Sequence, residues 1–177
     1  MSNVEPDIIT LGKSIGNGHP LSVTITRKDI ADIFNNGMEY FNSFGGNPVS
    51  CAVGQAVLNV IKDEDLQSNA FEVGSYLFQG LLNLKNRYEI IGDVRGRGLF
   101  LGVELIKESN HNHIISASEE AKTAINLMRD KNILLSTDGP DNNVIKIKPP
   151  LVFNRKNADY LLDSFDNVLS EMTIKVK

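Results

Sequence analysis

The chain has 177 residues, of which 41% are hydrophobic and 23% charged, so it can bury a core and is not a disordered polypeptide. Its formal net charge of -4 comes from scattered acidic residues, and no run of Lys or Arg is long enough to follow a phosphate backbone, which argues against a nucleic-acid partner. No stretch approaches the ~20 apolar residues of a membrane span, and MSNVEPDI lacks the layout of a signal peptide, so we expect a cytoplasmic protein with no membrane partner.

The first part of the chain predicts a strand, a glycine-rich loop, a second strand and a short helix. The β-branched runs DIITLG and LSVTITR flank the loop, and KDIADIF supplies the helix. The first strand has no preceding element to pair with. We therefore interpret residues 1–47 as a remnant of a larger domain, which makes the chain a carboxy-terminal part of a fold.

A connecting helix is expected at residues 48–63. Apolar residues repeat there at helical spacing, with Asn47 as the expected N-cap and Pro48 at the first helical position. We expect this helix to be largely buried. The single cysteine, Cys51, lies in it; it excludes an intrachain disulfide, favours a reducing compartment, and is expected to be a buried packing residue.

Residues 64–177 predict a small α/β domain in which helices cover strands. Apolar residues at helical spacing alternate there with β-branched runs that are bounded by turn residues. The expected elements, in order, are a helix from about residue 65 to 84, strands at 90–96 and 98–106, a loop at 107–113, a helix at 116–131 opened by a Ser/Glu capping pattern, strands at 132–137 and 144–150 around a turn, and a final helix through 161–172.

The stretch TLGKSIGNGHP places one lysine, Lys13, between glycines at the end of the first predicted strand. A Walker A phosphate loop would need a glycine where the chain has Asp7, and the glycines of GRGLFLG are one residue too far apart for a dinucleotide-binding motif. A lysine in such surroundings can be activated for Schiff-base chemistry, whereas a lone loop lysine is usually a solvated surface charge. The residues by themselves leave both interpretations open.

Four motifs in order decide between them. The chain reads PDIITLGKSIGNGHPLSVTITRKDI, then FNSFGGNPVSCAVGQAVLNVI, GDVRGRGLFLGVEL and IKIKPPLVF. In this order it resembles the class III (ornithine-transaminase-like) family of pyridoxal-phosphate-dependent aminotransferases, over nearly its whole length. Within that family the likeness is greatest to the ethanolamine-phosphate and phosphohydroxylysine phospho-lyases. The resemblance implies the end of a fold type I large domain followed by the small α/β domain, with pyridoxal 5′-phosphate as the cofactor.

The resemblance also implies roles for individual residues. Lys13 matches the lysine that forms the Schiff base with pyridoxal phosphate and shifts protons at the substrate carbon. Ser43 stands where the family usually has a threonine whose hydroxyl reaches the cofactor phosphate of the neighbouring subunit, which implies a homodimer. Gly45 and Gly46 would let the backbone approach that phosphate, although a turn alone also explains them.

Lys146 departs from the family pattern. Transaminase members have an arginine there that binds the substrate α-carboxylate as a bidentate fork, a geometry that lysine cannot copy. A primary amine without an α-carboxylate, such as phosphoethanolamine, would not require it. Alternation in VIKIK places Lys146 and Lys148 on one side of a strand, so two lysines on a solvated face remain the simpler alternative. His19, His111 and His113 lack further ligands around them and predict no metal site.

Two functions follow from this sequence. In the first, the chain is part of an active enzyme that acts on a primary amine by transamination or by phosphate elimination. In the second, it is a truncated, catalytically inactive association module. The family's glycine-rich phosphate turn, its stacking aromatic and its pyridine-binding Asp have no counterpart here, and a targeting peptide would also precede these residues, so a mitochondrial enzyme is compatible with the sequence.

Overall fold

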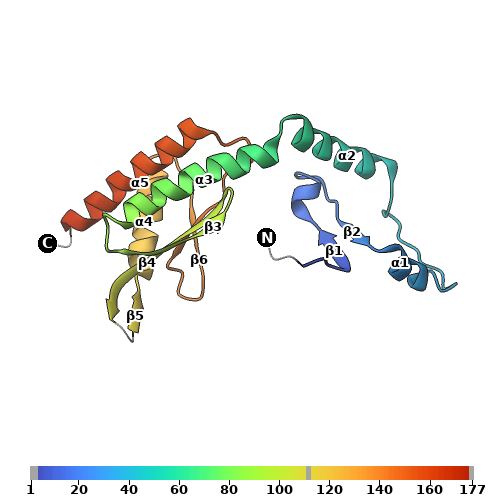
Figure 1. Cartoon of the computed structure of the whole chain (residues 1–177), viewed down its shortest axis with the longest axis horizontal. Coiled ribbons are helices and arrows are strands. Elements are labelled where there is room, and N and C mark those ends of the chain that lie inside the picture. Colours follow the sequence, from blue (N-terminus) through green and yellow to red (C-terminus); the bar gives the residue numbers. More distant parts are fainter. Residues whose placement is uncertain (1–3, 111–112, 176–177) are drawn as a thin grey trace. The chain divides into compact units, whose positions relative to one another are not determined.

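Residues 4–110 and 113–175 are described by the computed structural model, and the chain separates into two units, Met1–Asp65 and Leu66–Lys177 (Figure 1). No helix in the described part of the chain has the length and apolarity that crossing a membrane requires. The elements of the first unit, in chain order, are β1 Ile8–Leu11, η1 Lys13–Ile15, β2 Val23–Thr26, α1 Lys28–Phe34 and α2 Pro48–Asp63.

The first unit is a hairpin-like strand pair followed by two helices. The sequence predicts both strands, and in the structure β1 and β2 pair antiparallel with Ile8 opposite Thr26 and Leu11 opposite Val23. Every residue of β1 is exposed, and in the described part of this unit only Gly16 and Gly54 are fully buried. The unit therefore has no hydrophobic core of its own, and its apolar side chains face outward.

Helix α2 begins where the sequence predicts. Asn47 is its N-cap, with Oδ1 accepting a hydrogen bond of 2.9 Å from the Ser50 N–H, and Pro48 is the first helical residue. The expectation that this helix is largely buried is wrong, since Gly54 is its one buried residue. Cys51 is exposed as well, so its assignment as a buried packing residue is also wrong. The apolar spacing was correct, but too little of the unit lies against the helix to cover it.

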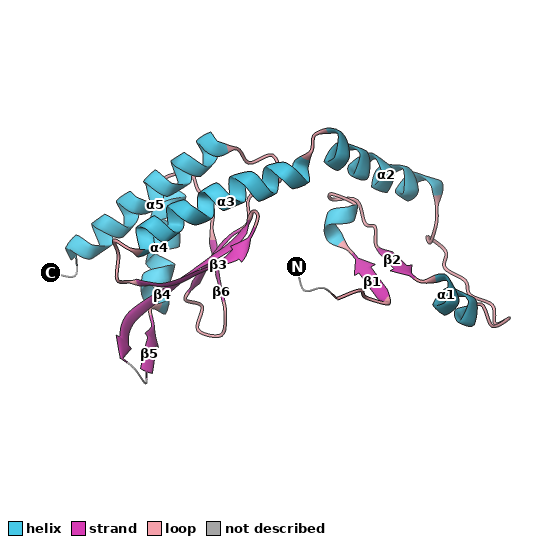
Figure 2. Ribbon diagram, viewed as in Figure 1, coloured by secondary structure: helices cyan, strands magenta, loops and turns pink. Residues whose placement is uncertain are grey.

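The second unit is an antiparallel sheet with helices packed on one face (Figure 2). The strand order is β3-β4-β7-β6, and β5 pairs with β4. The elements are α3 Leu66–Lys85, β3 Ile91–Arg97, β4 Phe100–Asn110, β5 His113–Ser116, α4 Ser118–Asp130, β6 Ser136–Asp138, β7 Val144–Ile147 and α5 Arg155–Lys175.

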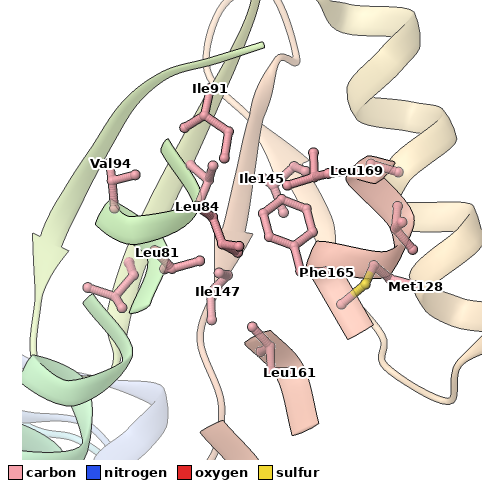
Figure 3. Close-up of a cluster of buried hydrophobic side chains, with 14 of the residues drawn as sticks. Leu81, Leu84, Ile91, Val94, Met128, Ile145, Ile147, Leu161, Phe165 and Leu169 are labelled. Atoms are coloured by element: carbon pink, nitrogen blue, oxygen red, sulfur yellow. The ribbon is translucent and has the colours of Figure 1, made fainter. Parts of the chain in front are cut away.

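The core of this unit lies between the sheet and the helices α3, α4 and α5. Phe165 of α5 is 1% exposed, and Figure 3 shows its ring among Ile145 of β7, Leu84 of α3 and Leu169 of α5. Alternate residues of β4 and β7 point into this core, which leaves their other face to solvent. Burying about twenty apolar side chains in this way makes the second unit the stable part of the chain.

Three local expectations were wrong. The polar stretch 107–113, predicted as a loop, is strand up to Asn110, and β5 begins at His113. An edge hairpin is held by ladder hydrogen bonds and does not need apolar side chains. His111 lies outside the described residues. Helix α4 has no side-chain cap, since both serines of the expected capping pattern bond to Asp141 instead. The segment before β6 is not strand, because Ile133 closes the end of α4 with a hydrogen bond from its N–H to the Met128 carbonyl.

Candidate functional site

Lys13 occupies the turn directly after β1. It is the first residue of η1 and has a φ of 50°, a left-handed conformation that residues other than glycine rarely adopt. Its side chain is exposed and, among the described residues, has no hydrogen-bond or ion-pair partner. Sparsely populated conformations of this kind cluster at functional sites. The strand therefore delivers a free amine at its end, held on an unusual backbone.

The second predicted segment, Ser43–Gly46, forms a turn organised by the preceding asparagine. Asn42 Oδ1 accepts hydrogen bonds from the backbone N–H groups of Phe44, at 3.2 Å, and of Gly45, at 3.0 Å. A Cβ atom on Gly45 would lie 2.9 Å from Asn42 Cγ, so this glycine is required by the turn itself.

The end of the same turn is open. Gly46 has a φ of 69° and no atom within 4 Å of a Cβ built on it, and no described residue accepts a hydrogen bond from its N–H. The Ser43 side chain is exposed, and its hydroxyl makes no hydrogen bond to the described part of the chain. Ser43 and Gly46 thus present a free hydroxyl and a free amide, the groups that an anionic ligand would use.

Both segments are attached to the first turns of α2. His19, which follows the Lys13 turn, has its Nε2 atom 2.8 Å from the Ser50 hydroxyl, and the Leu21 side chain packs against Gly54. The Ser43–Gly46 turn leads directly into the N-cap Asn47, whose side-chain amide donates to the Phe44 carbonyl. In the first unit, the Lys13 segment therefore contacts α2 through His19 and Leu21, and the Ser43–Gly46 turn precedes the N-cap of the same helix.

Lys146 belongs to the second unit, on β7. Its neighbours Ile145 and Ile147 are buried and Lys146 is half-buried, which confirms the predicted alternation. Its Nζ lies 2.9 Å from Asp138 Oδ2, and the hydrogen bond from Lys146 is the main reason that the pKa of Asp138 is below its ordinary value. Lys146 is therefore not a free cation but half of an ion pair across the β6–β7 hairpin.

Two features of these sites were missed by reasoning from the sequence. Asp138 was treated as a turn residue, because its pairing with Lys146 depends on a hairpin register that the sequence does not display. The sequence assigns no contact to His19, although its position beside the Lys13 loop is a usable signal. Arg95 pairs with Asp93 and Glu104. Among the described residues no group of three or more His, Cys, Asp or Glu side chains is arranged to hold a metal ion.

Comparison with known proteins places the chain in a family. The model of the family described as aminotransferase class III matches residues 1–169. Alanine--glyoxylate aminotransferase 2 homolog 2, mitochondrial, of Arabidopsis thaliana is 47% identical over 96% of this chain and 35% of its own length. Ethanolamine-phosphate phospho-lyase homolog 1 of Caenorhabditis elegans is 44% identical over 94% of this chain and 36% of its own length.

Solved structures agree. A phospholyase from Arthrobacter, in complex with phosphoethanolamine, superposes with a TM-score of 0.89 at 42% identity, over 95% of this chain and 39% of that one. The chain spans about a third of the length of the curated relatives it matches. By these matches the chain belongs to the class III aminotransferase family, whose cofactor is pyridoxal 5′-phosphate.

Proposed function

We propose that these residues are the carboxy-terminal part of a pyridoxal-phosphate-dependent enzyme that acts on a primary amine, with Lys13 as the residue that binds the cofactor covalently. The observation that carries the proposal is the state of Lys13 itself. It sits at a strand end in a left-handed conformation, with an exposed amine that no described residue pairs with. An amine that no described residue pairs with is available for covalent chemistry, whereas an amine held in an ion pair is not.

The side chains of the first unit fit this cofactor. Lys13 would hold pyridoxal phosphate through its side-chain amine, which is a nucleophile when neutral. The free Ser43 hydroxyl and the Gly46 N–H suit a phosphate group, because both donate hydrogen bonds and neither has a partner among the described residues. The Gly45 N–H is already bonded to Asn42, so we assign Gly45 to the shape of the turn rather than to direct phosphate binding.

Lys13 has a second task when substrate is present. Bound pyridoxal phosphate supplies an electron sink for the charge that develops on the substrate carbon. With substrate bound, the Lys13 Nζ would take the proton from the amine-bearing carbon as a general base and deliver it as a general acid. A lysine can do this only as the neutral amine, which favours a site that excludes water once the rest of the enzyme covers it.

Two reactions share these steps. In transamination Lys13 would move the proton away from the substrate carbon, and the amino group would pass to a second substrate. In phosphate elimination the carbon–oxygen bond of the substrate would break and inorganic phosphate would leave. For phosphoethanolamine, hydrolysis of the remaining enamine with one water gives acetaldehyde and ammonia, and phosphohydroxylysine would react in the same way at its own phosphate-bearing carbon.

We favour elimination because of Lys146. Its charge is already neutralised by Asp138, and a lysine cannot form the bidentate fork that recognises an α-carboxylate. A substrate without a carboxylate beside its amine makes no such demand. The phospholyase similar to this chain was solved with phosphoethanolamine, which supports the same substrate class. Because a relative is an alanine--glyoxylate aminotransferase homolog, transamination is the competing reaction.

A second candidate function, an association module without catalysis, is favoured by the surface of the first unit. Large apolar side chains stand exposed there, Phe41 by 79% and Phe44 by 83%. Patches of this kind mark surfaces that another part of a protein covers. In the enzyme we assign that cover to the remaining large domain and to a second subunit, so that Ser43 serves the partner's cofactor. If the chain is an association module, binding a partner through this same surface is its whole function.

Activity measurements separate these candidates. In the elimination arm, the protein that carries this chain is incubated with pyridoxal phosphate and phosphoethanolamine, and inorganic phosphate and acetaldehyde are quantified. In the transamination arm, L-alanine and glyoxylate replace phosphoethanolamine. Equal amounts of phosphate and acetaldehyde, abolished in Lys13→Ala but retained in the matched surface variant Lys28→Ala, are expected. Pyruvate and glycine formation without phosphate release would overturn the elimination assignment, and turnover that survives Lys13→Ala would overturn the role of Lys13.

A further inference from the structure

The dipeptide Asn-Gly occurs twice in the sequence, at Asn17–Gly18 and at Asn36–Gly37. In such a dipeptide the glycine nitrogen can attack the side-chain amide carbon of the asparagine, because glycine has no Cβ atom to obstruct the approach. The product is a five-membered succinimide ring, and ammonia is lost. Both dipeptides are exposed in the structure. The sequence therefore marks two candidate sites of deamidation and does not distinguish between them.

The side chain of Asn36 folds back over the peptide bond to Gly37. Its Oδ1 accepts a hydrogen bond of 3.1 Å from the Met38 N–H. The ring that this hydrogen bond closes contains both atoms that would react, Asn36 Cγ and the Gly37 nitrogen. The Gly37 N–H has no acceptor among the described residues, and a Cβ atom built on Gly37 would have no atom within 4 Å. The nucleophile is free, and the carbon that it would attack belongs to the same small ring.

The Met38 N–H is also placed to assist the reaction. Attack by the Gly37 nitrogen would move negative charge onto Asn36 Oδ1, the atom to which Met38 already donates. A donor that points at the atom where charge develops lowers the barrier, because it needs no rearrangement during the reaction. The folded loop therefore favours ring closure at Asn36.

Contacts between the flanking residues hold this turn in place. The rings of Phe34 and Tyr40 meet edge to face, with their centroids 5.6 Å apart, and so join the chain before the turn to the chain after it. The Asn36 N–H donates to the Phe34 carbonyl at 2.9 Å. The geometry that favours ring closure is thus part of the folded loop.

The equivalent groups around Asn17 are arranged differently. The amide two residues further on, the His19 N–H, donates to the Gly16 carbonyl at 3.0 Å and is not available to the Asn17 side chain. The Asn17 N–H donates to the Ser14 carbonyl at 3.1 Å, and no described residue bonds to the Asn17 side chain. Because the peptide bond to Gly18 lies between two amides that are already bonded, ring closure would first require this turn to open.

We propose that Asn36 is a modification site at which the folded chain deamidates, and that Asn17 is protected by its turn. A bond forms between the Gly37 nitrogen and Asn36 Cγ, the bond from Cγ to Nδ2 breaks, and ammonia leaves with the proton from Gly37. Addition of one water to either carbonyl of the succinimide gives aspartate or isoaspartate at position 36. Water is the only other reactant, and the proposal is independent of the reaction assigned to Lys13.

The modification would change the apolar surface of the first unit. Phe34 and Tyr40, on either side of the site, are both exposed. A carboxylate between them would lose its hydration if another protein surface covered the two rings, and this loss is unfavourable. Deamidation of Asn36 therefore opposes the covering of this surface.

Timed incubation of the 177-residue chain at mildly alkaline pH, followed by peptide mass spectrometry, tests the proposal. Deamidation raises the mass of a peptide by about 1 Da. In the folded chain Asn36 should deamidate at least about ten-fold faster than Asn17, the factor expected for one hydrogen bond to a developing charge. In concentrated urea the two rates should agree within about two-fold, because both dipeptides then belong to a flexible chain.

Two variants test the role of the Met38 amide. Met38→Pro removes this N–H, whereas Met38→Leu keeps it. Each rate at Asn36 is divided by the rate of the same variant in urea, which removes the effect of the substitution on the unfolded chain. This ratio should fall about ten-fold in Met38→Pro and stay unchanged in Met38→Leu. A folded-state rate at Asn36 no higher than that at Asn17, or an unchanged ratio in Met38→Pro, would overturn the proposal.

Hydrophobic-interaction chromatography of the aged chain tests the effect on the surface. Chains modified at Asn36 should elute before unmodified chains, because a charge now stands between Phe34 and Tyr40. Equal retention of the two species would overturn the proposed effect on this surface.

Discussion

Gly74 is a position where a single added methyl group would disturb the packing of the second unit. It is a buried residue of α3, and a Cβ atom on it would lie 2.2 Å from both the carbonyl carbon and the oxygen of Gly98, in the turn between β3 and β4. An ordinary contact needs at least 3.4 Å, so helix and turn would have to separate by about 1 Å. Gly98 has a φ of 54°, and the next residue, Leu99, is buried in the core, so the turn has little freedom to move.

The expected cost follows from two opposing terms. Backbone overpacking of this kind costs about 3 kcal/mol, at the upper end of the usual range. Alanine favours the helix over glycine by about 1 kcal/mol. Gly74→Ala should therefore lower the free energy of unfolding by about 2 kcal/mol, which shifts the urea midpoint by roughly 1 M at an m-value near 2 kcal/mol/M.

Gly80→Ala is the matched control. It lies in the same helix, and its new Cβ would meet Leu162 Cδ1 at 2.3 Å, which is the end of a flexible side chain that can rotate away. Its unfolding free energy should stay within about 1 kcal/mol of the parent chain. Urea unfolding followed by far-ultraviolet circular dichroism compares the three proteins. A Gly74→Ala midpoint equal to that of Gly80→Ala would refute the close helix–turn contact.

Three further predictions concern the core, a charge and the thiol. Phe165→Ala empties the centre of the core and should cost about 3–5 kcal/mol in urea unfolding; a loss below 1 kcal/mol would contradict the packing. In a carbon-13 NMR titration the pKa of Asp138 should lie below the ordinary value of about 3.9, and Lys146→Met should raise it. The ion pair with Lys146 therefore stabilises the fold above the ordinary pKa, and this stabilisation is lost as the pH falls through the lowered pKa. Cys51 should react with a thiol reagent in the native chain as fast as a free thiol; slow reaction would mean that another surface covers α2.

The sequence predicts correctly those features of the structure that depend on residues close together in the chain. Asn47 and Pro48 start α2 as predicted, because a cap and a first-turn proline act within a few residues. The β-branched runs pair as β1 and β2, and the alternation around Lys146 gives the correct buried and half-buried faces. The position of Lys13 at a strand end followed from the same pattern.

Properties that depend on distant partners could not be obtained in this way. The prediction that α2 is buried was wrong, because apolar residues at helical spacing indicate which face of a helix is hydrophobic but not whether these residues include a segment that packs on it. The partner of Lys146 depends on the β6–β7 register, and the hydrogen bond of His19 joins it to Ser50, which is 31 residues away in the sequence. Left-handed φ at Lys13 is a conformation that no sequence rule assigns to lysine.

Identifying the lysine that bonds to the cofactor is the most direct test of the role proposed for Lys13. The chain is mixed with pyridoxal phosphate and reduced with borohydride, and the modified peptides are quantified by mass spectrometry beside a Lys13→Ala variant. Near-stoichiometric modification of Lys13, absent from the variant and far above that of Lys28, is the predicted result. Slow modification spread evenly over the lysines, unchanged in the variant, would contradict the assignment of Lys13 as the cofactor-binding residue.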